Sequence, residues 1–580
     1  MRGPEAVIGV DVGTGSARAG IFAGDGAMLG KGEQAISLWR SGADFVEQSS
    51  TEIWAAVVAA VVAAREMAGE CTIRGIGFDA TCSLVVLGEA GAPLALGTDQ
   101  SPSGTGPIRD VPIRDVPIRD VPIRDVPIRD VPIRDVIVWM DHRALAEAAE
   151  INATHHPVLR YLGGRISPEM QTPKLLWLAR HRPEIFARAR HFFDLPDFLT
   201  WRASGAASRS LCSLACKWTY LGHERRWDES YFRAIGLGTL ADEGFRRIGT
   251  DVRAPGAPLG AGLSAAAAAE LGLPAGTPVG TSAIDAHAGG IGLIGAALDN
   301  QTPDQTAITH RLALIGGTSS CHMAVSAEPC FVPGVWGPYW GAMLPELWLN
   351  EGGQSATGAL IDHLVTTHAA WPALAAEAKA QGRSIYDVLN ARLAVLAEGK
   401  APERLTSGLH VLPDFHGNRS PRADPSLTGM ISGLTLAAGP DQLAILYLAA
   451  IQAIAYGTRH IVETMNEAGY AIDFVLATGG GSRNGLFLES HADALGLSVA
   501  VGRESEAVLL GAAILGAVAG GLYPRITAAM AAMSRVGRVI RPRGGAAARY
   551  HAAKYAVFQR LFADQMAYRA LMEDAAREVQ

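Results

Sequence analysis

The pattern of apolar and polar positions near the start of the chain predicts a strand, a tight turn and a second strand. Residues 6–12 form a short apolar run that ends in a glycine-rich turn, and a second apolar run follows at 17–22. Two such runs around a turn of glycine and hydroxyl residues are typical of a β-hairpin. The pattern further predicts a helix over 54–65 and strands over 73–78 and 84–87.

The second half of the chain repeats this arrangement. Residues 312–315 are an apolar strand that leads into a turn of glycine, threonine and serine, and another glycine turn at 479–484 follows a strand over 474–476 and precedes a helix over 486–495. A length of 580 residues also favours two domains of about 250 residues each. One glycine-hydroxyl turn in each half suggests two related domains that face one nucleotide.

Six tandem copies of Pro-Ile-Arg-Asp-Val occupy residues 107–136. A proline at every fifth position removes a backbone donor and disfavours helix at the preceding valine, so no regular helix or central strand is expected there. We interpret the repeat as an expanded surface loop ahead of a strand at 137–139. A partner-binding or lid segment is the alternative.

Composition and charge exclude some classes of function for this protein. Apolar residues make up 49% of the chain and charged residues 18%, which is typical of a folded globular protein. A net charge of −7 without a long basic run argues against nucleic acid as the main partner. The six cysteines form no CxxC pair, no cleavable signal pattern is present, and the most apolar stretch, 55–64, is too short to span a bilayer. We therefore expect a cytoplasmic protein without membrane contact.

The first hairpin carries candidate phosphate chemistry. A turn of glycine and hydroxyl residues exposes backbone N–H groups to phosphate oxygens. Asp11 at the end of the first strand could hold Mg²⁺, and Arg18 could neutralise charge on a transferred phosphoryl group. A buried aspartate that only caps its own hairpin is the alternative. The turn residues are Gly13, Thr14, Gly15 and Ser16.

Two further segments bear on ligand binding. The consecutive glycines 479–481 allow a nucleotide to approach the backbone closely, although neither the P-loop pattern nor the dinucleotide fingerprint is present. The spacing of Cys212 and Cys216 invites a metal interpretation, but without nearby histidine or cysteine partners we expect buried thiols.

Five motifs occur in the order seen in FGGY carbohydrate kinases, and the chain resembles that family from about residue 7 to about residue 524. They are VDVGTGS at 10–16, WMDHR at 139–143, IDA at 284–286, GGTS at 316–319 and GGGSRN at 479–484. The resemblance implies an α/β, actin-like ATPase fold with two ribonuclease-H-like domains around a central cleft. Residues 1–295 would mainly bind sugar and 296–580 mainly ATP, with a C-terminal helix.

The resemblance also implies in-line transfer of the ATP γ-phosphoryl group to a sugar hydroxyl, with ATP and Mg²⁺ as cofactors. Asp285 falls on the family's general base, and Asp11 falls on its Mg²⁺-linked aspartate. The turn at 13–16 matches one phosphate turn. The residues that match the second phosphate turn and the adenosine site are Gly317, Thr318 and Ser319, and Gly480, Gly481 and Asn484.

The segments CSLACKW at 212–218 and EGGQS at 351–355 resemble the ribulokinase branch, which implies that Lys217 and Glu351 contact the sugar. A solvated helix residue and a structural ion pair are the respective alternatives. Asp79 and Asp141 are further polar candidates for the substrate site, and either residue could instead orient a loop.

The expected reaction is phosphorylation of D-ribulose to D-ribulose 5-phosphate, with L-ribulose, ribitol or xylulose as alternative substrates. Cys82 stands where xylulokinases carry a histidine, which counts against D-xylulose.

Two functions of other classes stay open. A catalytically silent sugar-binding or regulatory relative would keep the fold, but it needs none of Asp11, Arg18 and Asp285. An actin- or Hsp70-like ATPase acting on proteins would need a peptide-binding domain, for which the helical tail at 525–580 is too short. A homodimer is compatible with the sequence, which does not fix the oligomeric state.

Overall fold

The computed structural model describes residues 3–42, 44–97, 132–298, 301 and 303–578, so most of the repeat at 107–136 lies outside the described residues. The contacts divide the chain into two compact units. The first comprises Met1–Gly292, Tyr339–Leu347 and Val508–Met533, and the second comprises Leu293–Pro338, Trp348–Ala507 and Ser534–Gln580. Along the chain, the first unit gives way to the second after Gly292, close to the predicted boundary between 1–295 and 296–580. Residues 508–533, however, belong to the first unit and not to the second.

The main sheet of the first unit is built on the predicted hairpin. β1 (Glu5–Val12) pairs antiparallel with β2 (Ser16–Ala23), which confirms the hairpin, and β2 pairs antiparallel with β3 (Met28–Ala35). On the other side, β6 (Thr72–Ala80) runs parallel to β1, and β12 (Ala283–Ile284) runs parallel to β6. The strand order is therefore β12-β6-β1-β2-β3.

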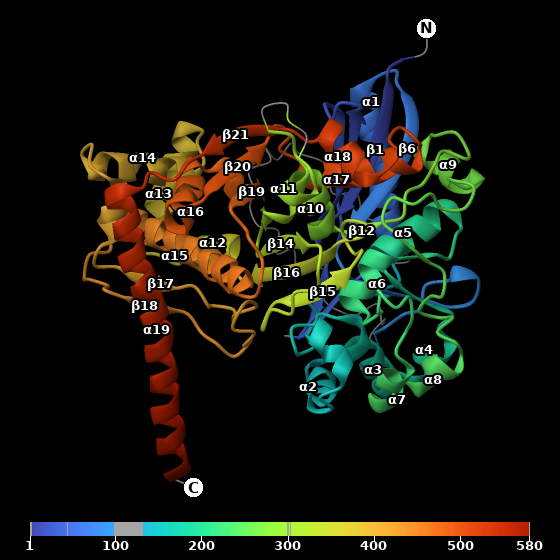
Figure 1. Cartoon of the computed structure of the whole chain (residues 1–580), viewed down its shortest axis with the longest axis horizontal. Coiled ribbons are helices and arrows are strands. Elements are labelled where there is room, and N and C mark those ends of the chain that lie inside the picture. Colours follow the sequence, from blue (N-terminus) through green and yellow to red (C-terminus); the bar gives the residue numbers. More distant parts are fainter. Residues whose placement is uncertain (1–2, 43, 98–131, 299–300, 302, 579–580) are drawn as a thin grey trace. The chain divides into compact units, whose positions relative to one another are not determined.

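Helices cover both faces of this sheet. Ile8 and Val10 of β1 pack in one hydrophobic cluster with residues of α1 (Ser50–Ala68). Gly9 lies between them in sequence, so it points to the opposite face. There α17 (Ala507–Ala519) approaches so closely that a Cβ at Gly9 would lie 2.1 Å from the Leu509 carbonyl oxygen. Figure 1 shows α17 beside β1 and β6, which explains why this late segment belongs to the first unit.

A second sheet of the first unit has the strand order β4-β5-β8-β7-β9. Its strands are β4 (Trp39–Ser41), β5 (Phe45–Gln48), β8 (Val136–Ile137), β7 (Leu84–Leu87) and β9 (His191–Asp194). Residues 84–87 match the prediction, and β8 is the strand expected after the repeat. The other elements of this part are α2 (Leu145–Ala153), α3 (Gln171–His181), α4 (Pro183–Arg188), α5 (Leu195–Ser204), β10 (Arg209–Ser210), α6 (Leu211–Lys217), α7 (Glu229–Ala234), α8 (Gly238–Asp242), β11 (Val252–Arg253), α9 (Ala265–Leu271), α10 (Asp285–Ile294) and α18 (Ile526–Met533).

The sheet of the second unit repeats the topology of the first. Its order is β15-β16-β14-β13-β19-β20-β21. The central β13 forms an antiparallel hairpin with β14 and runs parallel to β19, as β1 does with β2 and β6. This repetition supports the prediction of two related domains. The strands are β13 (Arg311–Gly316), β14 (Ser320–Ser326), β15 (Trp336–Trp340), β16 (Trp348–Gln354), β19 (Phe474–Gly479), β20 (Ser498–Gly502) and β21 (Val536–Ile540).

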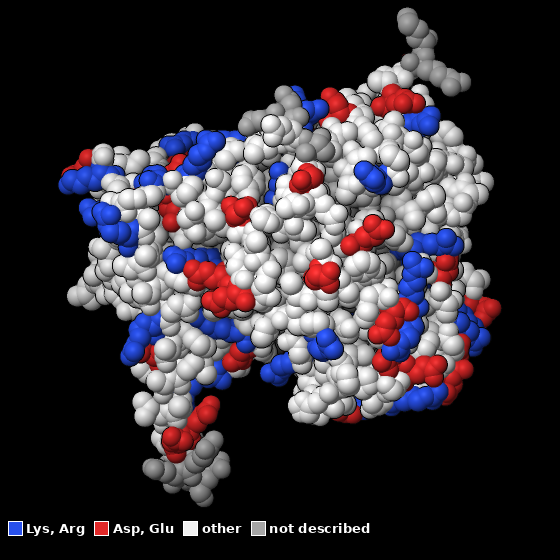
Figure 2. Space-filling view, viewed as in Figure 1, with Lys and Arg blue, Asp and Glu red and all other residues white. Residues whose placement is uncertain are grey.

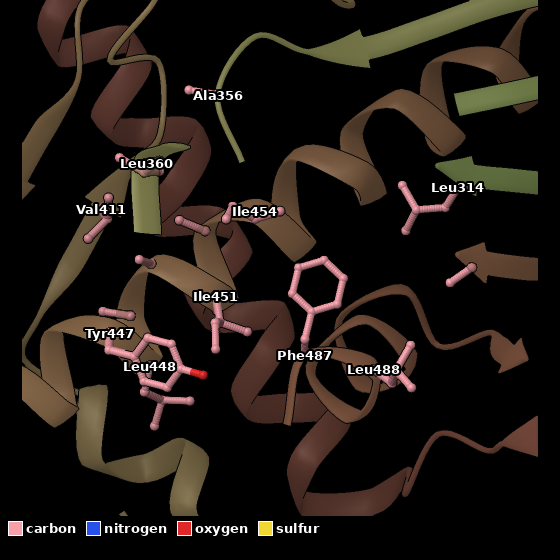
Figure 3. Packing of buried hydrophobic residues seen from close by; sticks show 14 of the residues in the cluster. Leu314, Ala356, Leu360, Val411, Tyr447, Leu448, Ile451, Ile454, Phe487 and Leu488 are labelled. Carbon is pink, nitrogen blue, oxygen red and sulfur yellow. The ribbon is translucent and has the colours of Figure 1, made fainter. Parts of the chain in front are cut away.

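The core of the second unit surrounds α15 (Pro440–Glu467). By length and composition this helix could cross a membrane, but 83% of its most apolar window is buried, as expected of a core helix. Figure 3 shows Leu448, Ile451 and Ile454 of α15 near Phe487 and Leu488 of α16. The remaining elements here are α11 (Gln305–Thr309), α12 (Gly358–Thr366), α13 (Trp371–Gln381), α14 (Ile385–Ala397), β17 (His410–Leu412), β18 (Met430–Ser432) and α16 (Gly485–Leu495).

The chain closes with α19 (Gly545–Glu578), which confirms the predicted helical tail. Phe558 and Leu561 are buried in a small cluster with Tyr456 of α15, and Tyr555 and Phe562 pack at its edge. On the face shown in Figure 2, basic and acidic side chains are intermixed. That distribution agrees with the mild net charge of the sequence.

Candidate active site

Three carboxylates gather where adjacent strands of the first unit end. On β1, Asp11 lies opposite Arg18 of the antiparallel β2 and opposite Asp79 of the parallel β6. Asp285 begins α10 directly after β12, whose Ala283 pairs with Asp79. Since the carboxyl ends of neighbouring parallel strands share one edge of a sheet, the fold brings Asp11, Asp79 and Asp285 together.

The electrostatics of this group follow from its burial. Asp11 is 1% exposed and Asp79 is fully buried, while the Arg18 guanidinium forms an ion pair with Asp11. Burial raises the pKa of Asp79 well above its usual range, and the charges of Asp11 and Asp285 and a hydrogen bond with Asp11 raise it further. Crowded carboxylates are the ligands that a hard cation prefers, so these residues fit Mg²⁺.

The turn after β1 is held by side chains from elsewhere in the unit. Gln48 Nε2 donates to the Thr14 carbonyl oxygen at 2.8 Å, and Trp139 Nε1 donates to the Thr14 hydroxyl at 3.0 Å. The backbone N–H of Gly13 donates to the Ser16 carbonyl oxygen at 3.0 Å. A Cβ at Gly15 would meet no heavy atom within 4 Å among the described residues, so the turn leaves room for a ligand.

Lys217 is the last residue of α6 and is only 3% exposed, so the alternative of a solvated helix residue is wrong. Its helix is anchored at both ends. The Ser210 hydroxyl caps the N-terminus by accepting from the Cys212 N–H at 3.2 Å, and Trp218 Nε1 donates to Asp194 at 2.8 Å beyond the C-terminus. This burial separates Lys217 from an ordinary surface lysine.

The two cysteines of α6 are buried thiols, as predicted, but the expectation that no histidine lies near them is wrong. His287, on the first turn of α10, places its Nε2 3.4 Å from the Cys216 Sγ. No local pattern marks this contact, because the two residues are far apart along the chain.

Asp141 lies at a different place from the three carboxylates. Its Oδ1 accepts from the backbone and Nε of Arg143, and its Oδ2 accepts from Arg143 Nη2 and from the Val46 N–H. Each oxygen therefore already has two donors, which favours the alternative that Asp141 orients a loop.

Sequence reasoning missed Lys174. This fully buried lysine donates to the carbonyl oxygens of Val138, Trp139 and Glu169 at 3.0 to 3.3 Å, and burial lowers its pKa. It thereby fixes the backbone of Trp139, which in turn holds the Thr14 hydroxyl. The lysine stands in a helix without a recognisable motif, so no sequence signal marked it.

In the second unit, the two glycine turns lie side by side. Gly316 at the end of β13 pairs with Gly479 at the end of the parallel β19. Gly479 has a φ of 90°, and a Cβ there would lie 1.9 Å from the Gly316 carbonyl oxygen, so both conformation and space require glycine. The turn formed by Gly317, Thr318 and Ser319 follows β13 directly and is closed by a 2.8 Å bond from the Gly317 N–H to the Ser319 carbonyl oxygen.

Gly480 and Gly481 belong to a short 3-10 turn, and Asn484 ends it. The Asn484 side chain caps α16 by accepting from the Leu486 N–H at 3.1 Å, and it donates to the Tyr447 hydroxyl at 2.6 Å. A Cβ at Gly480 would meet no described heavy atom within 4 Å. The turn is thus anchored through Asn484 and open at Gly480.

Glu351 lies on β16 of the second unit and is 3% exposed. The Cys321 thiol donates to its Oε1 at 3.8 Å, and Arg419 Nη1 donates to the same sulfur at 3.8 Å. Glu351 is thus a buried carboxylate beside a thiol and a guanidinium group.

Comparisons with known proteins agree with these features. Residues 128–292 match the N-terminal domain and residues 312–520 the C-terminal domain of the FGGY family of carbohydrate kinases. An FGGY carbohydrate kinase domain-containing protein of Danio rerio is 49% identical over 98% of this chain and 99% of its own length. A D-ribulokinase of Saccharomyces cerevisiae is 38% identical over 89% of this chain and 72% of its own length.

A solved structure shares the fold. The xylulose kinase from Rhodospirillum rubrum superposes with a TM-score of 0.74 over 97% of this chain and 99% of its own, at 22% identity. The predicted α/β fold of the actin-like ATPase class, with two domains, is confirmed. The chain belongs to the FGGY family of carbohydrate kinases and is a phosphotransferase.

Proposed function

We propose that this enzyme transfers the γ-phosphoryl group of ATP to a hydroxyl group of a five-carbon ketose, with D-ribulose as substrate and D-ribulose 5-phosphate as product. The observation that carries the proposal is the meeting of Asp285 with Asp11 and Asp79 at adjoining strand ends, beside Arg18. Similarity to the yeast D-ribulokinase supports ribulose as the sugar.

Each residue near the strand ends has a distinct task. Asp285 accepts the proton of the attacking sugar hydroxyl, and Arg18 neutralises charge on the transferred group. Asp11 would hold Mg²⁺, which supplies positive charge to the phosphate oxygens when bound. Burial and the neighbouring carboxylates raise the pKa of Asp79, so a proton taken up at Asp79 limits repulsion among the carboxylates.

The binding residues complete the proposal. The turn at 13–16 and the turn formed by Gly317, Thr318 and Ser319 bind phosphate through backbone N–H groups, and Gly480, Gly481 and Asn484 lie at the adenosine. Lys217 and Glu351 bind the sugar, for which a lysine supplies donors and a glutamate acceptors. The enzyme acts in the cytoplasm on a small-molecule substrate.

ADP release with Mg-ATP tests the function against D-ribulose, L-ribulose, D-xylulose, ribitol and glycerol. We expect selective turnover with D-ribulose. Selective turnover with another pentose or pentitol would reassign the substrate. Absence of sugar-stimulated ADP release with all five compounds would favour a silent sugar-binding relative.

Asp285→Asn tests the general base. The introduced amide can keep the hydrogen bond that Asp285 Oδ1 accepts from the Ala286 N–H at 2.7 Å, but it cannot accept the substrate proton. We expect turnover to be abolished while ATP binding persists. The matched control is Asp304→Asn, because Asp304 likewise accepts a helix N–H, that of Ala307, at 2.7 Å. Retained turnover in Asp285→Asn would refute the assignment.

A further inference from the structure

We propose that Cys212, Cys216 and His287 form a binding site for Zn²⁺ in the first unit. Cys212 and Cys216 are four residues apart on α6, so their side chains lie on the same face of that helix. His287 reaches this face from the first turn of α10. The two sulfur atoms and an imidazole nitrogen lie within 4.8 Å of one another, and all three residues are fully buried.

The spacing agrees with tetrahedral zinc coordination. Zn–S bonds of about 2.3 Å and Zn–N bonds of about 2.0 Å place a sulfur and a nitrogen ligand about 3.5 Å apart, and two sulfur ligands about 3.8 Å apart. The Cys216 Sγ and His287 Nε2 are separated by 3.4 Å. Small movements of the cysteine side chains therefore suffice to bind a metal ion.

The ligand set also selects the metal. Two thiolates and one imidazole suit Zn²⁺, whereas Mg²⁺ prefers oxygen ligands, so this site is chemically distinct from the carboxylates near Asp11. The Cys212 sulfur accepts a hydrogen bond from the Ile284 N–H at 3.5 Å, and such a bond stabilises a thiolate. Binding releases the two thiol protons to solvent as two S–Zn bonds and one N–Zn bond form. Three protein ligands leave the fourth position to a water molecule.

The position of the site gives it a regulatory role, and this role rests on the proposed kinase function. Cys216 immediately precedes Lys217, and Ile284 immediately precedes Asp285. A zinc ion bound here would draw α6 and the first turn of α10 toward the metal, because the ligand atoms now lie up to 4.8 Å apart, and it would thereby shift the backbone that carries both of those residues. Since phosphoryl transfer depends on their placement, we expect bound Zn²⁺ to lower turnover.

Metal binding is tested without nucleotide or sugar, so its outcome does not depend on the kinase assignment. The reduced full-length protein is titrated with Co²⁺, and binding is monitored through the sulfur-to-cobalt charge-transfer absorption. Zn²⁺ is then added to displace the cobalt. We expect one Co²⁺ per chain in the wild type and in Cys71→Ser, a control cysteine away from the site. In Cys216→Ser and His287→Gln we expect a loss of affinity larger than the roughly 100-fold caused by losing an outer partner of a metal ligand.

The second arm measures ADP release at fixed Mg-ATP with increasing Zn²⁺. Inhibition of the wild type and Cys71→Ser, together with its loss in Cys216→Ser, would support the regulatory role. Thermal melting of each variant verifies the fold, and His287→Gln provides an independent test if Cys216→Ser does not fold. Equal cobalt spectra in wild type and folded variants would overturn the site. Binding without inhibition in an active enzyme would overturn the regulation.

Discussion

Asp194 links three elements of the first unit through a buried carboxyl group. It ends β9, and its Oδ2 accepts from Gln171 Nε2 at 3.0 Å and from Trp218 Nε1 at 2.8 Å. Burial raises its pKa from the ordinary value of 3.8 to about 7, and the charge of Asp197 contributes in the same direction. The folded protein therefore binds a proton at Asp194 more readily than the unfolded chain does.

The sign of the pH effect follows from this difference. Between pH 3.8 and about 7 the folded state holds a proton that the unfolded state has lost, so the free energy of unfolding falls as the pH rises through this window. Each pKa unit corresponds to about 1.4 kcal/mol, so the full penalty reaches about 4 kcal/mol above pH 7. Asp194→Asn cannot ionise and keeps an oxygen acceptor. We therefore predict that it matches the wild type at low pH and exceeds its stability at high pH.

The assay is urea denaturation at pH 5 and pH 8.5, followed by tryptophan fluorescence. Asp441→Asn is the control, because the Asp441 side chain is 58% exposed. We expect the urea midpoint of Asp194→Asn, relative to that of the wild type, to be higher at pH 8.5 than at pH 5. The midpoint of Asp441→Asn should change with pH as that of the wild type does. Parallel pH dependence of the wild type and Asp194→Asn would refute the reasoning that burial keeps this carboxyl group protonated.

Other changes to the chain test the packing of α17, the sugar site and the repeat. Gly9→Ala places a Cβ 2.1 Å from the Leu509 carbonyl oxygen, so thermal melting should show a loss of stability of about 1–3 kcal/mol. Gly15→Ala places its Cβ in open space, so it should raise the KM for ATP without changing Tm. An unchanged Tm in Gly9→Ala would contradict the close packing of α17. Lys217→Met should raise the KM for the sugar about tenfold or more, since it removes charged hydrogen bonds, and an unaltered KM would remove it from the sugar site. Deleting five of the six repeat copies within 107–136 should leave kcat nearly unchanged, and a large loss of kcat would overturn the passive-loop interpretation.

Local pattern predicted much of the fold. The hairpin of β1 and β2, strand β7 and helix α16 were found close to the expected residues, since each depends on nearby apolar periodicity and turn residues. The family motifs supplied the fold class, which the comparisons confirm.

The remaining features depend on contacts between distant segments. Asp79 could be named from sequence only as a polar candidate, because its hydrogen bond with Asp11 arises from the parallel register of β6 on β1. The contact between Cys216 and His287 likewise depends on how α6 packs near α10. Lys174 donates hydrogen bonds to backbone carbonyl groups, and no sequence pattern identifies which carbonyl groups a lysine will reach.

The packing of α17 on the first sheet has a consequence for biosynthesis. The face of β1 and β6 that includes Gly9 and Gly77 is completed by a helix that leaves the ribosome more than 400 residues later. During synthesis that face stays uncovered while most of the second unit, up to Ala507, is made. The first unit therefore reaches its native packing only near the end of translation, and a fragment that stops at Gly292 would expose a glycine-lined apolar surface prone to association.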